Sequence, residues 1–226
     1  MKKRIVSLML TAALLTGAAS AAGEAGTAEQ PDLDLSAASA VLMEKETGDL
    51  LYEKESHQQL EPASVTKVMT LLLIMEELDS GRLSKEDMVT VSAAAAGMGG
   101  SQVYLKEGEH LSAGELIKCI AVVSGNDAAV AMAEHLAGSE AAFVERMNQR
   151  ARELGMEDTS FVNCTGLPAA GHRSSAYDIA LMSRELILNH PSIREYTTIW
   201  MDSIRDGAFG LTNTNRLVRF YQGATG

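Results

Sequence analysis

Ser64 and Lys67 are the two residues of this sequence with the clearest capacity for chemistry. They form a Ser-x-x-Lys pattern directly after Pro62, and the residues that follow have a helical pattern. The spacing therefore predicts that both side chains lie on one face of a helix, one turn apart. A helix N-terminus favours developing negative charge, and a desolvated lysine with a lowered pKa can activate a neighbouring serine hydroxyl as a nucleophile. In the alternative interpretation, Ser64 caps the helix and Lys67 extends its ammonium group to solvent.

A second polar pattern, Ser124-Gly125-Asn126, separates two apolar segments of helical period. Serine, glycine and asparagine are also the ordinary residues of a turn, so this pattern alone does not indicate a site. Together with Ser-x-x-Lys, however, it predicts a serine nucleophile. The same pair, followed by a later Lys-Thr-Gly, is typical of penicillin-binding proteins and class A β-lactamases.

The elements that must position these residues are mostly helical. Alternation around Gly48 predicts a β-hairpin over residues 38–55. A segment apolar on nearly every side predicts a central buried helix that begins just after Pro62 and ends before Gly81. Four further helices are expected, and they cover residues 112–123, 127–136, 139–154 and 176–189. A loop over 163–175 and an irregular tail from Asp206 complete the expected layout. A lone hairpin is marginal in water, so it must pack on the helices or on strands beyond Gly226.

The N-terminus predicts export. Lys2-Lys3-Arg4, an apolar run over residues 5–15 and small residues up to Ala21 are the three parts of a secretory signal peptide, residues 1–21. The alternative, a membrane anchor, is disfavoured because the apolar run is too short to span a bilayer. Residues 22–36, rich in Gly, Ala, Glu and Asp, are typical of a flexible lead. Removal of the three basic residues at the N-terminus would change the formal charge from −11 to −14.

Composition excludes several classes of function. The 226 residues are 46% hydrophobic, which is enough for a sizeable core, and an acidic chain with 4% aromatic residues is unsuited to nucleic acid. Cys119 and Cys164 can form a disulfide outside the cytoplasm or be small buried hydrophobes. The histidines have no metal-ligand spacing, so we expect no metal; they are His57, His110, His135, His172 and His190. His172, like Asp178, is expected to serve capping and loop hydrogen bonds.

The chain resembles the D-alanyl-D-alanine carboxypeptidases, the low-molecular-mass penicillin-binding proteins that trim peptidoglycan stem peptides. The resemblance runs from about Ala38 to Gly226, and the segments that carry it are residues 43–48, 62–70, 123–128, 166–168, 174–178 and 213–217. It implies an α/β (α+β) penicillin-binding/β-lactamase-like transpeptidase fold with a helical subdomain and a sheet that is incomplete in this sequence. The serine D-Ala-D-Ala peptidase domain would occupy residues 37–226.

The resemblance also implies roles for the residues. Ser64 would be the nucleophile, Lys67 the general base and Ser124 the proton relay, while Asn126 and Gly125 would bind substrate. No cofactor is implied. The expected partners are stem peptides ending in D-Ala-D-Ala and β-lactams, which would acylate Ser64. The expected setting is the periplasmic or extracellular face of the cytoplasmic membrane, with a part in peptidoglycan biosynthesis, cell wall organization and cell shape.

One departure from the family pattern is the absence of Lys-Thr-Gly. The sequence stops at Gly223-Ala224-Thr225-Gly226, about where relatives are a few residues short of that motif. We therefore expect a C-terminally truncated chain, with the missing strand, a β-rich domain and an amphipathic membrane anchor beyond Gly226. We expect residues 22–226 alone to react poorly with penicillin or not at all.

Two alternatives to this function stay open. A class A β-lactamase-like hydrolase would need a glutamate for deacylation, and Glu185-Leu186-Ile187-Leu188-Asn189 fits that family's Glu-x-x-Leu-Asn pattern. Periodicity explains this segment as an ordinary helix with Leu186 and Ile187 in the core. A non-catalytic exported protein of the same fold is the second alternative.

Overall fold

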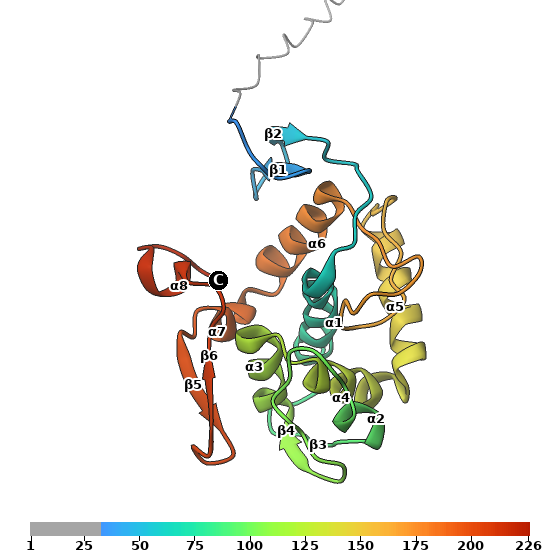
Figure 1. The fold of residues 1–226 in the computed structure, drawn as a ribbon, viewed down its shortest axis with the longest axis vertical. Coiled ribbons are helices and arrows are strands. Elements are labelled where there is room, and N and C mark those ends of the chain that lie inside the picture. Colours follow the sequence, from blue (N-terminus) through green and yellow to red (C-terminus); the bar gives the residue numbers. More distant parts are fainter. Residues whose placement is uncertain (1–32) are drawn as a thin grey trace, which may run out of the picture. The chain divides into compact units, whose positions relative to one another are not determined.

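The computed structural model describes residues 33–226, so the predicted signal peptide and most of the flexible lead lie outside the described residues. Helices dominate the described part of the chain (Figure 1). They are the 3₁₀ turns η1 (Ala63–Thr66) and η2 (Pro191–Ile193) and the α-helices α1 (Lys67–Asp79), α2 (Ala93–Ala96), α3 (Ala113–Val123), α4 (Asn126–Ala137), α5 (Glu140–Glu153), α6 (Ala176–Asn189), α7 (Arg194–Thr197) and α8 (Leu217–Phe220).

Helix α1 is the centre of the core, as its apolar circumference predicts. It contacts α3, α4, α5 and α6. Met69, Leu72, Ile74 and Met75 are completely buried, and each side chain of this kind stabilises the fold by about 1.5–3 kcal/mol through loss of water contact. Because α1 is held on several sides, the turn that precedes it is attached to the most rigid part of the molecule.

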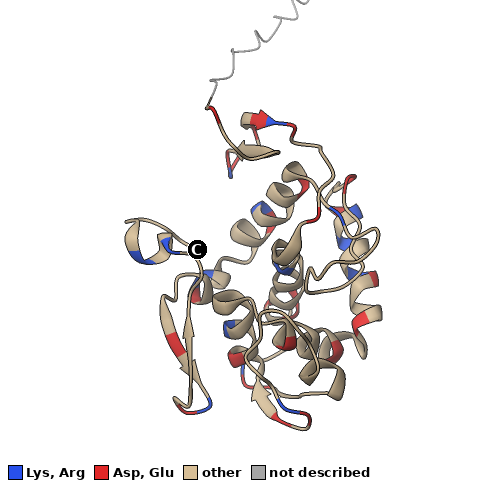
Figure 2. Cartoon of the chain, viewed as in Figure 1, with Lys and Arg blue, Asp and Glu red and all other residues tan. Residues whose placement is uncertain are grey.

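The other predicted helices are confirmed to within one residue at each end, and serine caps explain where several of them begin. Ser112 and Glu115 form a reciprocal capping box at the start of α3, and the Ser139 and Ser175 hydroxyls accept hydrogen bonds from the third residues of α5 and α6. Charged residues of both signs line α5 (Figure 2), whereas those of α1 lie at its two ends, Lys67 at the start and Glu76, Glu77 and Asp79 in the last turn.

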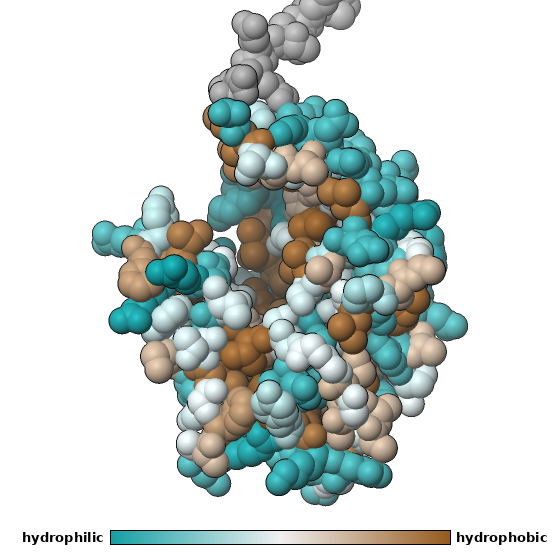
Figure 3. Space-filling model, viewed as in Figure 1, coloured by the Kyte–Doolittle hydropathy of each residue, from teal (hydrophilic) through white to brown (hydrophobic). Residues whose placement is uncertain are grey.

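The strands form three separate antiparallel pairs in the described residues. They are β1 (Ala40–Met43) with β2 (Leu50–Lys54), β3 (Met88–Thr90) with β4 (His110–Ser112), and β5 (Met201–Ile204) with β6 (Phe209–Thr212). The first pair is the predicted hairpin, and its strand β1 packs on α6. Figure 3 shows hydrophobic residues exposed in a hollow beside this hairpin. In the hairpin itself, Leu42 and Leu51 are both more than half exposed.

The predicted irregular tail is wrong in part. From Asp206 onward the chain forms β6, which pairs with β5, and the short helix α8. Neither joins β1 and β2, so the hairpin has no third strand among residues 33–226. The pair β3 and β4 was also not expected, because each strand has only three residues. Within the described chain, no helix combines the length and the apolar character needed to cross a membrane.

Candidate active site

Ser64 and Lys67 are brought together at the junction of η1 and α1. The Lys67 ammonium nitrogen, Nζ, lies 3.4 Å from Ser64 Oγ. Ser64 is exposed to solvent. The first backbone hydrogen bond of the turn runs from Val65 N to Pro62 O, so the N–H of Ser64 stands outside the helical ladder. An exposed hydroxyl, a buried amine and an N–H group outside the helical ladder therefore lie together at the start of helix α1.

Burial makes Lys67 an unusual lysine. Only 3% of its surface is exposed, and desolvation of the charged form lowers its pKa from 10.5 to about 8, while Cys164 opposes this shift. Lys67 has no ion-pair partner among residues 33–226; its other hydrogen bond goes to the backbone carbonyl of Thr165, 2.7 Å away. The alternative in which Lys67 reaches solvent is excluded, and Ser64 makes no capping hydrogen bond.

The carbonyl that binds Lys67 belongs to a tightly bonded loop, residues 163–167. Asn163 Oδ1 accepts hydrogen bonds from Thr165 N, Thr165 Oγ1 and Gly166 N, and Asn163 Nδ2 donates to Leu167 O. Gly166 has φ +84°, and a Cβ atom there would lie 1.8 Å from Ala63 O in η1. The loop and the serine turn are thus packed backbone against backbone, which only glycine permits.

Ser124, Gly125 and Asn126 connect α3 to α4, and both helices pack on α1. Ser124 ends α3 in a left-handed conformation, φ +59°, and its hydroxyl has no hydrogen-bond partner among the described residues. Gly125 is the N-cap of α4. A hydrogen bond from Ser124 or Asn126 to Ser64 or Lys67 is likewise absent from the described residues, so the relay and substrate-binding roles stay predictions.

Asn126 is oriented by the loop before β4. Its backbone N–H donates to Ser101 O and its Nδ2 donates to Gly99 O, each over 2.7 Å. These bonds leave Asn126 Oδ1 buried and without a partner in the described structure. Since a buried unpaired carbonyl oxygen costs free energy, it is available to accept a hydrogen bond from a bound group.

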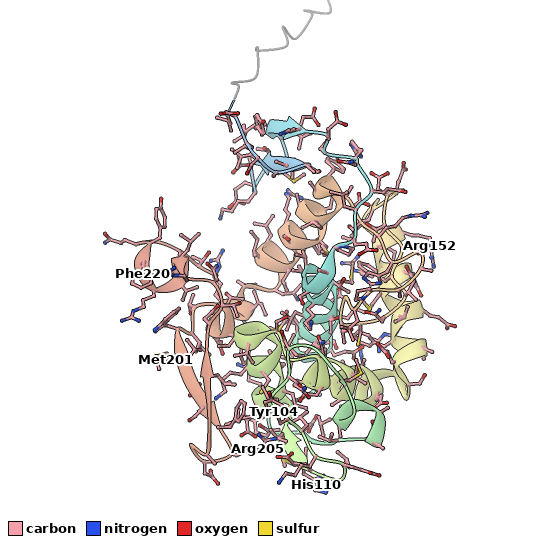
Figure 4. The ribbon with its side chains drawn as sticks, in the orientation of Figure 1. Tyr104, His110, Arg152, Met201, Arg205 and Phe220 are labelled. Atoms are coloured by element: carbon pink, nitrogen blue, oxygen red, sulfur yellow. The ribbon has the colours of Figure 1, made fainter. Side chains whose placement is uncertain are left out.

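The same loop is held from both sides by charged residues. The buried carboxylate of Asp127 accepts hydrogen bonds from Val103 N and Leu105 N. Arg205, at the β5–β6 turn, donates to the carbonyls of Val103 and Tyr104 and pairs with Glu109. Figure 4 shows Tyr104 and Arg205 close to one another. The backbone that orients Asn126 is therefore fixed by contacts that no local pattern in the sequence reveals.

Several other residues named from the sequence have structural roles. Glu185 pairs with Arg150 at 2.6 Å, which agrees with its interpretation as part of an ordinary helix. Asp178 is bonded to Thr159 Oγ1 and Asp158 N, although Ser175 provides the cap of α6. Cys119 and Cys164 are both free and buried, so the disulfide alternative is excluded in this structure.

One group of potential metal ligands occurs in the described part of the chain. The ligand atoms of Glu76, Glu185 and His190 lie within 4.8 Å of one another. Arg150 donates to both carboxylates, at 2.7 and 2.6 Å, and already supplies the positive charge that a metal ion would bring. The group is therefore an ion-pair network between α1, α5 and α6.

The site contains two contributors that the sequence did not indicate, the Thr165 carbonyl and the Asn163 side chain that orients it, and Gly166 was noted only as part of the family resemblance. An Asn-x-x-Gly spacing is a turn signal and could have drawn attention to this loop. A backbone carbonyl carries no signature in residue identity, so its contact with Lys67 could be found only from the structure.

Comparisons by family model, by sequence and by structure all find similarity to D-alanyl-D-alanine carboxypeptidases and penicillin-binding proteins. A family model described as D-alanyl-D-alanine carboxypeptidase matches residues 24–226. D-alanyl-D-alanine carboxypeptidase DacF of Bacillus subtilis is 49% identical over 229 residues, which cover 100% of this chain and 59% of DacF. Penicillin-binding protein 6B of Escherichia coli superposes with a TM-score of 0.80 at 37% identity, over 86% of this chain and 62% of that one. Penicillin-binding protein D2 of Listeria monocytogenes, solved in an ampicillin-bound form, superposes with a TM-score of 0.76 at 32% identity, over 85% of this chain and 78% of that one.

Proposed function

The chain belongs to the D-alanyl-D-alanine carboxypeptidase family, and from this premise we propose that the whole protein removes the terminal D-alanine of peptidoglycan stem peptides through an acyl-enzyme on Ser64. The chain spans 59% of the length of DacF, so the activity is proposed for the protein with any residues that follow Gly226. The observation that carries the proposal is the buried Lys67 amine beside the exposed Ser64 hydroxyl, with its pKa lowered to about 8.

We propose the following steps, in which the relay role of Ser124 is carried over from the resemblance to the family. Neutral Lys67 Nζ takes the proton of Ser64 Oγ as that oxygen bonds to the carbonyl carbon of the penultimate D-alanine. The free Ser64 N–H donates to the oxygen that becomes negatively charged. The C–N bond then breaks, and the proton passes from Lys67 through Ser124 Oγ to the leaving D-alanine nitrogen. Water hydrolyses the Ser64 ester, which returns the proton to Oγ.

The Thr165 carbonyl is suited to support this cycle. It binds Lys67 Nζ in both protonation states, because either the amine or the ammonium group can donate to it. It brings no full negative charge, so it does not restore the lysine pKa to its ordinary value as a carboxylate would. Lys67 is held in place while it remains a base near neutral pH.

A β-lactamase-like hydrolase is the nearest alternative, and the two differ in deacylation. A β-lactamase needs a carboxylate that activates water beside the ester, whereas Glu185 is bound by Arg150 and Asn189. We therefore propose that the penicilloyl ester on Ser64 is long-lived. Ampicillin, the β-lactam bound to the Listeria protein, belongs to the inhibitor class expected here.

Fluorescent penicillin tests this function directly. The protein expressed from its natural reading frame, with whatever follows Gly226, should acquire one covalent label that persists after removal of free reagent. Ser64→Ala should abolish the label, and Ser192→Ala should leave it unchanged, since the Ser192 hydroxyl makes no hydrogen bond in the described chain. A folded protein that never labels would refute the enzyme proposal, and rapid release of the label would favour a β-lactamase.

We also propose that the protein works outside the cytoplasm after cleavage following Ala21. This rests on the basic head, the short apolar run and the small residues of the first 21 positions. Fractionation of cells that carry the natural gene, with intact-mass analysis, should find a protein that begins at Ala22 on the outer side of the cytoplasmic membrane. A cytosolic protein that still begins at Met1 would contradict this. A part in cell shape would follow from the trimming of stem peptides at that location.

A further inference from the structure

His172 is a buried histidine whose two ring nitrogens both have partners. Only 4% of the residue is exposed. The N–H of Val162 donates to His172 Nδ1 over 3.0 Å, and His172 Nε2 lies 2.7 Å from Thr66 Oγ1. Because Nδ1 accepts a hydrogen bond, the proton of the neutral imidazole is on Nε2, which donates to the Thr66 hydroxyl. The surrounding structure thus selects a single tautomer.

Thr66 lies between Ser64 and Lys67, on the opposite side of the serine turn from solvent. It is completely buried, whereas Ser64 and Val65 are exposed. Ser64 itself has only the long contact to Lys67 to hold its side chain. The turn is also under backbone strain, because Ala63 has φ +46°. Contacts at Thr66 can therefore set the position of Ser64, which lies two residues earlier in the same turn.

Three successive contacts join the loop over residues 160–175 to this turn and the start of α1. His172 bonds to Thr66, the Thr165 carbonyl to Lys67, and the Cys164 carbonyl to Thr70 Oγ1 at 2.7 Å. Of the three, the bond from His172 is the one made to the segment that carries Ser64. Gly166 of the loop also packs against Ala63 in this turn, but the bond from His172 is the one hydrogen bond from the loop to η1 among residues 33–226.

We propose that His172 is a positioning residue for the Ser64–Lys67 pair, which acts by donating its Nε2 proton to Thr66 Oγ1 and so holds Ser64 within reach of Lys67. This rests on the proposed function, because it concerns the acylation of Ser64. His172 touches neither substrate nor the reacting atoms in this scheme.

The charged groups around His172 indicate how pH should act on this contact. Its partners from other elements are the Thr66 hydroxyl and the Phe161 ring, both uncharged, and Lys67 follows Thr66 on α1. The carboxylate of Glu61, before η1, favours a charged imidazole, but burial outweighs it and lowers the pKa of His172 below its ordinary 6.5. Protonation would place a second proton on Nδ1, against the N–H of Val162, and so disrupt the arrangement as pH falls.

Two conservative variants separate the two bonds of His172. In His172→Gln the side-chain amide reaches the position of Nε2 and keeps a donor for Thr66, whereas in His172→Asn it reaches the position of Nδ1 and keeps only an acceptor for Val162. We expect His172→Gln to be acylated by fluorescent penicillin within about threefold of the wild-type rate and His172→Asn about tenfold more slowly. Thr66→Val, which removes the acceptor with little change of shape, should match His172→Asn, and the double variant should be no slower than either.

The pH profile provides a readout that a purely structural role would not move. In the wild type, the logarithm of the acylation rate should fall with a slope of one below the Lys67 pKa of about 8 and more steeply below the pKa of His172. In His172→Gln the slope should remain one. Thermal unfolding of each variant at pH 8 checks that the fold is retained.

The outcomes distinguish this inference from the proposed function. If the wild type never labels, the proposed function fails. If the wild type labels but His172→Asn and Thr66→Val label at its rate, His172 does not position the pair. Rescue by asparagine and not by glutamine would show that the bond to Val162 is the important one, and would also overturn the inference.

Discussion

Replacing Lys67 by methionine should abolish acylation of Ser64 and at the same time increase the free energy of unfolding. The loss of acylation follows because no other base lies within hydrogen-bond distance of Ser64 Oγ in the described chain. At pH 7 a lysine with a pKa of about 8 is roughly 10% neutral, against roughly 0.03% at its ordinary pKa, so burial supplies about 300 times more base. Methionine supplies none.

The gain in stability follows from the sign of the pKa shift. Lys67 binds its proton less tightly in the folded state, so between pH 8 and 10.5 the unfolded chain holds more protons and stability rises with pH. Below pH 8 both states are protonated, and the folded state carries the full cost of a buried charge, about 3 kcal/mol for a shift of this size. Methionine removes that cost but leaves the Thr165 carbonyl unpaired, and the lost hydrogen bond reduces the gain in stability by about 1 kcal/mol.

Denaturant unfolding at pH 7 and penicillin labelling measure both effects. Lys118→Met is a matched control, because Lys118 is partly buried but pairs with Asp202 at 2.8 Å. The control should keep the label and lose a little stability. A Lys67→Met protein that still labels, or that is less stable than the wild type at pH 7, would show that Lys67 is not a desolvated base.

Gly166→Ala should be among the most damaging single-methyl additions that this chain can receive. The new Cβ would lie 1.8 Å from Ala63 O, and φ at this position is +84°. The left-handed conformation alone costs an L-residue about 1–2 kcal/mol. Relief of the backbone clash must also move the loop away from η1, so we expect a total loss of at least about 4 kcal/mol and loss of acylation in whatever remains folded.

Gly171→Ala separates the two causes. Gly171 has nearly the same backbone conformation, φ +85°, but a Cβ there would meet nothing within 4 Å. The Gly171→Ala variant should lose only the cost of the left-handed conformation, about 1–2 kcal/mol of its free energy of unfolding, and keep its acylation rate. Chemical denaturation of both variants, with labelling of the folded fraction, makes the comparison. Equal losses in the two variants would mean that Gly166 and η1 are not in close backbone contact.

The helical part of the fold could be predicted because its signals are local. The apolar circumference of α1 predicts its burial, and Ser112, Ser139 and Ser175 mark the starts of helices through their capping bonds. Strands β3 and β4 could not be predicted, because three-residue strands carry almost no periodicity and their pairing spans a long loop. The strand β6 was missed for a different reason, because Gly210 interrupts the alternation of its four residues.

In the candidate site, too, the local features could be predicted from the sequence and the long-range contacts could not. The i, i+3 spacing of Ser64 and Lys67 on one helix end was enough to place them together, and the apolar surroundings of Lys67 were enough to predict its lowered pKa. The contacts of Asn126 and of Lys67 with the carbonyls of Gly99 and Thr165 could not be predicted. They join segments far apart in the chain through backbone atoms that every residue possesses.

The two buried cysteines have a practical consequence for spectroscopy. Burial raises the pKa of the Cys119 thiol to about 12 and that of Cys164 well above its ordinary value, so neither forms the reactive thiolate at neutral pH. Maleimides and spin-label reagents should therefore leave the native protein unmodified. A single exposed substitution, such as Tyr104→Cys in the loop that orients Asn126, could then carry a probe with both natural cysteines kept in place, and the mobility of that probe could be followed while an acyl group forms and leaves.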